Sequence, residues 1–200
     1  ITSAVQAVRS IAKVEYAKGY SIDTDQVNPE LQAEAVALAK KADVAVLFVG
    51  LTDAYESEGY DRSHMRMPEN QNALIDAVCA VNDRVVVVLH NGSPVEMPWA
   101  DKVGGILEMY LGGQAVGGAT VDLLFGAVSP SGKLPVTFYK SADMLPDFTD
   151  YSMKNRTYRF CDDESNVLYP FGYGLTYSHF ECGDVSYKDN MLTVNVTNTG

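Results

Sequence analysis

The chain has 200 residues, 46% of them hydrophobic and 20% charged, which is the composition of an ordinary globular protein with room for one good core. Its net charge of −11 and its pI near 4.6 argue against nucleic acid or an anionic membrane surface as a partner. No apolar run approaches the roughly 20 residues of a membrane span, and residues 1–12 lack the basic start and apolar centre of a signal peptide.

The first quarter of the chain predicts two helices and two strands. Apolar residues recur at helical spacing within residues 3–11, and residues 14–16 have the pattern of a short strand. A clear amphipathic helix is expected from about residue 29 to residue 41, ending in two lysines that suit the helix dipole. An apolar strand over residues 44–49 follows directly.

The same alternation continues to residue 138. Pro68 lies at the first turn of an expected helix that runs to about Val81. The strongest strand is 84–89, whose run of valines fits the centre of a sheet. The remaining expected elements are a strand over 105–110, a helix over 119–125 and a strand over 134–138. Alternating strands and helices predict an α/β fold, with a mostly parallel sheet flanked by helices as an α/β sandwich.

The pattern changes class towards the C-terminus. Residues 1–150 are expected to form the α/β domain, and residues 151–180 an irregular, aromatic-rich connection. Apolar and polar residues alternate from Leu192 to Thr197, as in antiparallel strands. We therefore expect residues 181–200 to be the truncated start of an all-β domain. Because the chain also begins without methionine, we expect it to be part of a longer protein.

A charged segment follows the apolar strand that ends near residue 50. This acidic loop, residues 55–62, carries three carboxylates, an arginine and two tyrosines around Gly59. Ligands gather at the carboxyl ends of parallel strands, so the loop is a candidate site, and the alternative is a solvated loop without function. Tyr55 and Tyr60 favour a site, because their apolar surface would shield a carboxylate. A shielded carboxylate stays protonated to higher pH, as a general acid requires.

Other motifs predict no metal or cofactor site. The three cysteines have no CxxC or Cys/His spacing, and the three histidines form no ligand pair, although His90 is expected at the rim of the sheet. The glycine-rich turn 112–118 matches neither the dinucleotide nor the P-loop template. Close backbone packing on a neighbouring domain, or contact with a neutral sugar, explains it better. Trp99 is expected in the core rather than as a sugar-stacking platform.

Six short motifs follow one another along most of the chain. They are ESEGYDR at 56–62, PVEMPW at 94–99, GGQ at 112–114, LFG at 124–126, PSGKLPVTF at 130–138 and YPFGYGLTY at 169–177. In this order they resemble the second domain of family 3 glycoside hydrolases, the β-glucosidase family. Each motif alone is modest, but six in register make the resemblance specific.

The resemblance implies that the catalytic residues come from two different domains. In that family a (β/α)₈ barrel supplies an aspartate nucleophile and the α/β domain supplies the acid/base glutamate, often with a fibronectin type III-like domain added. Carried onto this chain, the acid/base residue is Glu58, with Glu56 as the competitor. Residues 181–200 would open the fibronectin type III-like domain. The partners implied are the barrel of the same protein and a β-glycoside or oligosaccharide, with no cofactor.

The other residues of the loop are expected to bind substrate or to orient the loop. Asp61 next to Arg62 should stay ionised, which makes it a poor proton donor, and Arg62 should hydrogen-bond Glu56 or another carboxylate. Tyr60 is likewise expected to bind substrate or to orient the loop. The predicted function is the acid/base half of a retaining, exo-acting β-glycosidase, and the alternative is a non-catalytic carbohydrate-binding or interaction module. The sugar and the localisation, cytoplasmic or secreted, stay open.

Overall fold

Three parallel strands form the centre of the molecule. The computed structural model describes residues 1–60, 62–161 and 164–200. The strands of the sheet, in spatial order, are β1 (Ala45–Gly50), β2 (Val85–His90) and β3 (Gly105–Glu108). Val88 of β2 lies between Phe48 and Leu107 of its neighbours. The parallel sheet confirms the predicted α/β class, and the valine-rich strand is its central one, as expected.

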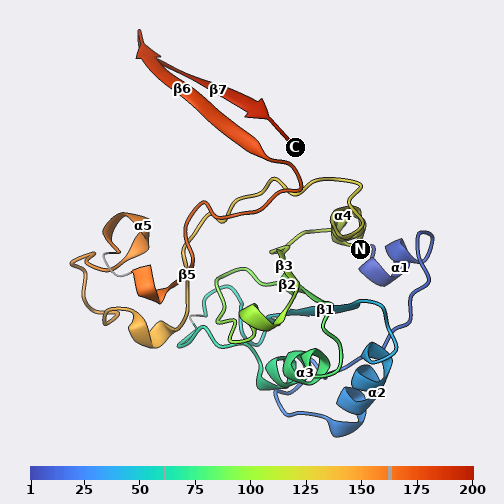
Figure 1. Ribbon diagram of the computed structural model, residues 1–200. Helices are drawn as coiled ribbons and strands as arrows, with labels where there is room; N and C mark the ends of the chain where they lie inside the picture. The colour runs from blue at the N-terminus through green and yellow to red at the C-terminus, as the bar shows by residue number, and fades with distance from the viewer. Residues whose placement is uncertain (61, 162–163) are drawn as a thin grey trace.

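Helices flank this sheet. They are α1 (Ala4–Val8), α2 (Pro29–Ala39), α3 (Glu69–Cys79) and α4 (Val116–Leu124), with a 3₁₀ turn η1 (Ala100–Lys102) before β3. In Figure 1, α2 and α3 pack together below the sheet, and α1 and α4 pack together above it. Asn28 fixes the start of α2, because its side-chain oxygen accepts the N–H groups of Glu30 and Leu31 at 3.0 and 3.1 Å.

The core joins α3 to the sheet. Ile75 of α3 and Val87 of β2 are fully buried within one apolar cluster, and each such side chain contributes about 1.5–3 kcal/mol by burial. Trp99 belongs to the same cluster and is 1% exposed. Its indole N–H donates to Oδ1 of Asn72 at 3.0 Å. The prediction of a core tryptophan is confirmed, and its ring is closed to a sugar.

A buried glutamine fixes the end of β1. Gln71 on α3 is 2% exposed, and its side-chain amide accepts the N–H of Gly50 at 2.8 Å and donates to the carbonyl of Gly50 at 2.9 Å. Gly50 cannot carry a side chain, because a Cβ atom there would lie 1.9 Å from the carbonyl oxygen of His90. These contacts determine where the chain leaves the sheet for the acidic loop.

The glycine-rich turn packs backbone against backbone. Gly117 donates its N–H to the carbonyl of Thr2 at 3.1 Å, and the N–H of Thr2 donates to the carbonyl of Gln114 at 3.1 Å. A Cβ atom on Gly117 would lie 2.3 Å from that same carbonyl oxygen of Thr2. Close backbone packing is therefore the reason for glycine here, but the neighbour is the start of α1 and not another domain.

Two expected strands are wrong. Residues 14–16 are irregular and exposed. Residues 134–138 do not extend the parallel sheet: only β4 (Phe138–Tyr139) is a strand, and it pairs antiparallel with β5 (Val167–Tyr169). The reason is that the backbone of Leu134 pairs with a segment further along the chain. Its N–H donates to the carbonyl of Tyr173, and its carbonyl accepts the N–H of Gly172, both at 2.8 Å.

The rest of the chain leaves the sheet. The connection contains η2 (Ala142–Met144), α5 (Thr157–Phe160) and η3 (Glu164–Asn166). It leads to the hairpin of β6 (Phe180–Lys188) and β7 (Met191–Asn198), which projects away from the α/β part (Figure 1) and is exposed along its whole length. Asp189 and Asn190 have positive φ angles of 51° and 59°, as a two-residue type I′ turn requires. Antiparallel strands after residue 180 were predicted, and the domain boundaries at 150 and 180 stay a prediction.

Candidate functional site

The acidic loop leaves the carboxyl end of β1 through two consecutive turns. The N–H groups of Tyr55 and Glu56 donate to the carbonyl of Thr52 at 2.8 and 3.0 Å, and the N–H of Tyr60 donates to the carbonyl of Ser57 at 3.2 Å. Gly59 supports the second turn with a φ of 77°, in the left-handed region that favours glycine. Asp61, a predicted loop-orienting residue, lies outside the described residues.

Glu56 is fixed to the loop that follows β2. Its Oε2 accepts the N–H of Gly92 at 2.6 Å, and its Oε1 accepts the hydroxyl of Ser93. Both carboxylate oxygens are thus engaged by the loop after β2. Glu56 therefore works as an anchor for the loop, which is one of the two roles that the sequence left open for it.

Arg62 is fixed to the same place from the other end of the loop. Its Nη2 donates to Oγ of Ser93 at 2.8 Å and to the carbonyl of Pro94 at 2.9 Å. Burial lowers the pKa of Arg62, and the nearby charge of Glu56 acts in the opposite direction. The expected direct hydrogen bond to Glu56 is not formed among the described contacts. The two side chains meet on Ser93 instead, so Arg62 orients the loop through a shared partner.

Glu58 lies between these two anchors and is exposed. Within the described part of the chain its carboxylate contacts no hydrogen-bond donor, in contrast to Glu56 two residues earlier. The aromatic shielding expected from Tyr55 and Tyr60 does not cover it. The loop thus holds one glutamate in place and presents the other outward.

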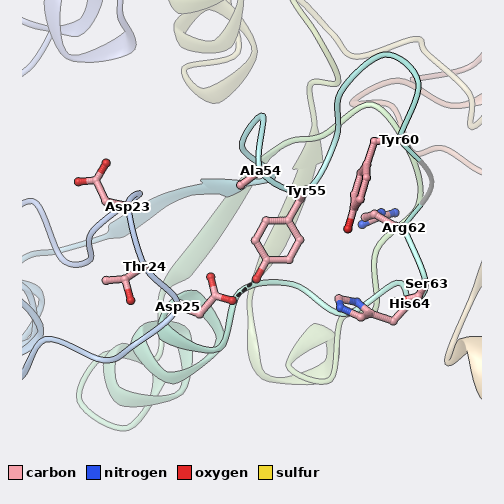
Figure 2. Close-up of a pocket in the computed structure, with 9 residues that line it drawn as sticks. All are labelled: Asp23, Thr24, Asp25, Ala54, Tyr55, Tyr60, Arg62, Ser63 and His64. Atoms are coloured by element: carbon pink, nitrogen blue, oxygen red, sulfur yellow. Dashed lines mark hydrogen bonds between the residues drawn. The ribbon is translucent and has the colours of Figure 1, made fainter.

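The tyrosines instead line a pocket of about 400 Å³ beside the loop. Figure 2 shows the hydroxyl of Tyr55 donating to Asp25, and the ring of Tyr60 lying next to Arg62. Burial, with the hydrogen bond and charge of Asp25, raises the pKa of Tyr55 to about 12. Tyr60 is 56% exposed. Neither Glu56 nor Glu58 lines this pocket, so it lies next to the predicted acid and does not contain it.

Sequence reasoning missed Glu108, which ends β3 on the same edge of the sheet. Its Oε1 accepts the N–H of Tyr110 at 3.0 Å, and its Oε2 accepts Nδ2 of Asn91 at 3.2 Å. Burial raises the pKa of Glu108 to about 7 against the effect of these hydrogen bonds, and the charge of Glu56 raises it further. The available signal was a single charged residue inside an otherwise apolar strand pattern.

His90 lies at the end of β2, where the sequence expected a rim residue. Its ring stacks on Phe48, with 6.2 Å between the ring centroids. Burial lowers the pKa of His90, and a hydrogen bond with the backbone of Tyr110 acts in the opposite direction. His90 therefore supports the edge of the sheet from within.

The described residues offer no site for a metal. No three side chains of His, Cys, Asp or Glu among them gather closely enough to hold an ion. No helix in this part of the chain combines the length and apolar character that a membrane crossing needs.

Comparison of sequences relates the chain to known glycosidases. Residues 1–177 match the family model described as the glycosyl hydrolase family 3 C-terminal domain. The thermostable beta-glucosidase B of Acetivibrio thermocellus is 47% identical over 204 residues, which cover 92% of this chain and 27% of that protein. An exo-alpha-(1->6)-L-arabinopyranosidase of Bifidobacterium longum is 42% identical, over 94% of this chain and 27% of its own length.

Solved structures agree with this relationship. The family 3 β-glucosidase of Bifidobacterium adolescentis superposes with a TM-score of 0.89 at 39% identity, covering 100% of this chain and 32% of that one. A Kluyveromyces marxianus β-glucosidase in complex with glucose gives a TM-score of 0.76 at 35% identity, over 86% and 22% of the two chains. The chain thus spans roughly a quarter to a third of the length of these relatives. It belongs to glycosyl hydrolase family 3, and corresponds to the C-terminal domain of that family.

Proposed function

We propose that this chain is the acid/base-supplying part of a retaining, exo-acting β-glycosidase of the β-glucosidase type, and that Glu58 is the acid/base residue. The observation that carries the proposal is the contrast within the acidic loop: Glu56 and Arg62 are anchored to Ser93, and Glu58 is held between them without a partner in the described chain. Relatives named as β-glucosidases support the reaction class.

The reaction would need a second carboxylate from outside the chain. An aspartate of a (β/α)₈ barrel in the same protein would attack the anomeric carbon while Glu58 protonates the departing glycosidic oxygen. Glu58 would then deprotonate a water molecule, which attacks the glycosyl-enzyme intermediate and releases the sugar with retained configuration. Nothing in this scheme requires a metal or a cofactor.

Two other glutamates lie near the loop, and each is a weaker candidate for the acid. Both oxygens of Glu56 are occupied by Gly92 and Ser93, so neither is free to face a leaving group. Glu108 has the raised pKa that is typical of a general acid. However, both of its oxygens are also occupied, and it is mostly buried behind Asn91. Glu58 is the one that a bound glycoside could reach.

The remaining loop residues would support Glu58. Arg62 would keep the loop in register through Ser93 and Pro94. Tyr60, exposed beside Arg62, would contact the substrate or its leaving group (Figure 2). Asp61 is assigned to loop orientation from the sequence alone. The relatives carry both β-glucosidase and arabinopyranosidase names, so the sugar is left open.

The leaving-group dependence of Glu58→Ala tests this role in the complete enzyme. We expect hydrolysis of phenyl β-glucoside, whose leaving group needs a proton, to fall by about 10²–10⁴-fold. Glycosylation by 2,4-dinitrophenyl β-glucoside, whose leaving group departs without protonation, should be affected much less. The matched control is Glu34→Ala, an exposed glutamate on α2. Equal losses with both substrates would rule out Glu58 as the acid.

A further inference from the structure

A line of hydrogen bonds connects the three strand ends behind the acidic loop. Asn91, directly after β2, donates its Nδ2 to Oε2 of Glu108 at 3.2 Å and to the carbonyl of Ser93 at 2.9 Å. Ser93 in turn holds Glu56 and Arg62 through its hydroxyl. The end of β3 is thus linked, through the loop after β2, to both anchors of the loop after β1.

Glu108 and Ser93 together determine how the amide of Asn91 is oriented. Asn91 is fully buried, and its Oδ1 has no hydrogen-bond partner among the described residues. A reversed amide would aim that oxygen at two acceptors, the carboxylate of Glu108 and the carbonyl of Ser93, which is unfavourable. The carboxylate of Glu108 is therefore what keeps the donor of Asn91 turned towards Ser93.

Glu108 is itself held in a rigid setting. Its other oxygen accepts the N–H of Tyr110 at 3.0 Å, and Tyr110 has a φ of 48°, an uncommon value for a bulky side chain. Such strained backbone persists only where its surroundings determine it, and it is concentrated at functional sites. The backbone of Tyr110 is also hydrogen-bonded to His90 at the end of β2.

We propose that Glu108 is a positioning residue for the acid/base loop: its ionised carboxylate orients Asn91, and Asn91 holds the Ser93 turn on which Glu56 and Arg62 are anchored. The inference rests on the proposed function of Glu58, because it concerns how Glu58 is placed. When Glu108 takes up a proton, its new O–H requires an acceptor, and the unpartnered Oδ1 of Asn91, on the side chain that Glu108 already contacts, can supply one. The amide would then reverse and Ser93 would lose its donor, so the loop would loosen.

Two ionisable groups interact with Glu108 in the described structure. Glu56, from the loop after β1, disfavours its negative charge. Tyr110 lies two residues beyond the end of β3, and burial and the charge of Glu108 raise the pKa of its hydroxyl. Arg62 lies one contact further away, where the charge of Glu56 acts on it. Because burial raises the pKa of Glu108 to about 7, its protonation falls in a range where the enzyme can be assayed. The effect on activity therefore has a pH dependence that a purely structural residue would lack.

The test is Glu108→Gln in the complete enzyme, with Glu34→Gln as the matched control. Glutamine permanently carries a donor towards Asn91 and so imitates protonated Glu108. We expect kcat/KM for phenyl β-glucoside to fall about 10-fold, within the roughly 10²-fold cost of misplacing a catalytic group by 1 Å. The value for 2,4-dinitrophenyl β-glucoside should change less than about twofold on the same reasoning. The ratio of kcat/KM for phenyl β-glucoside to kcat/KM for 2,4-dinitrophenyl β-glucoside should fall as the pH drops through 7 in wild type, and Glu108→Gln should show no such fall.

The double variant Glu58→Ala/Glu108→Gln separates the two proposals. If Glu108 acts through Glu58, the second substitution costs nothing further on phenyl β-glucoside. A full additional loss, or a Glu108→Gln enzyme that behaves as Glu34→Gln does, would overturn the inference and leave the role of Glu58 intact. Loss of leaving-group selectivity in Glu58→Ala would overturn both. If Glu108→Gln does not fold, Asn91→Ala breaks the same line of contacts, and an unselective loss there would overturn the inference.

Discussion

Glu56 and Glu58 lie two residues apart in one loop, yet they have opposite surroundings. Glu56 uses both carboxylate oxygens to bind Gly92 and Ser93, whereas Glu58 is exposed and has no partner in the described chain. The first arrangement stabilises a conformation of the loop, and the second leaves a group available to something else. This difference between the two glutamates is the structural basis for proposing Glu58, and not Glu56, as the acid/base residue.

The same contrast recurs on the scale of the whole chain. The end of β1 is fixed by two buried hydrogen bonds from Gln71, and β2 is buried at the centre of the sheet. The hairpin of β6 and β7 is exposed from end to end. Buried contacts therefore hold the sheet and the anchors of the acidic loop, whereas Glu58 and the side chains of the hairpin are exposed in the described structure.

The largest expected effect is a complete loss: residues 1–200 alone should hydrolyse no aryl β-glucoside. A retaining mechanism needs two carboxyl groups about 5–5.5 Å apart on opposite sides of the scissile bond. Within the described part of the loop, Glu56 does not supply the second one, because it is engaged with Gly92 and Ser93. The assay is release of the aryl group by the purified chain. Turnover that Glu58→Ala abolishes would mean that the site is complete within this chain.

Glu56→Ala should cost less activity than Glu58→Ala but more stability. Removing Glu56 leaves the N–H of Gly92 and the hydroxyl of Ser93 without their acceptor, so we expect a loss of about 1–3 kcal/mol in the unfolding free energy of the chain. Glu58→Ala, at an exposed position, should stay within about 0.5 kcal/mol. Urea unfolding of both variants measures this. A larger loss of hydrolysis in the complete enzyme from Glu56→Ala than from Glu58→Ala would reverse the two assignments.

Gln71→Ala should lower the stability of the chain, because Gln71 anchors the end of β1. It leaves the N–H and the carbonyl of Gly50 buried and unpaired, at about 1–3 kcal/mol for each group. We expect the urea midpoint to fall accordingly. Gln32→Ala on α2, where the side chain makes no hydrogen bond among the described residues, is the control and should change little. Equal midpoints for the two variants would show that Gln71 does not fix the end of β1.

Hydrogen exchange gives the smallest and most local test. Amide groups from residue 181 onward should exchange fast, because a two-stranded hairpin without a covered face is marginally stable. Amide groups of β2 should exchange slowest, since both of its neighbours are strands of the sheet. Strong protection over residues 185–196 in the monomeric chain would show that the hairpin is anchored after all.

The sequence was sufficient to predict an element where the local pattern of residues determines its structure. The run of valines at 85–88 predicts a central strand, because only a sheet interior suits it. It was insufficient for residues 134–138, whose partner is decided by the distant residues 167–173. Glu108 was missed for a similar reason: its burial and its contact with Asn91 depend on how three strand ends meet. The acidic loop could be located, but the pairing of Arg62 with Ser93 could not.

The central claim is that Glu58 is the acid/base residue, and azide tests it most directly. In the Glu58→Ala complete enzyme the glycosyl intermediate should form from 2,4-dinitrophenyl β-glucoside and then persist, because no base activates water. Added azide needs no base, so it should restore turnover and yield β-glucosyl azide, identified by NMR. Glu56→Ala should show no such rescue. An absence of rescue in Glu58→Ala, or a product of α configuration, would contradict the account.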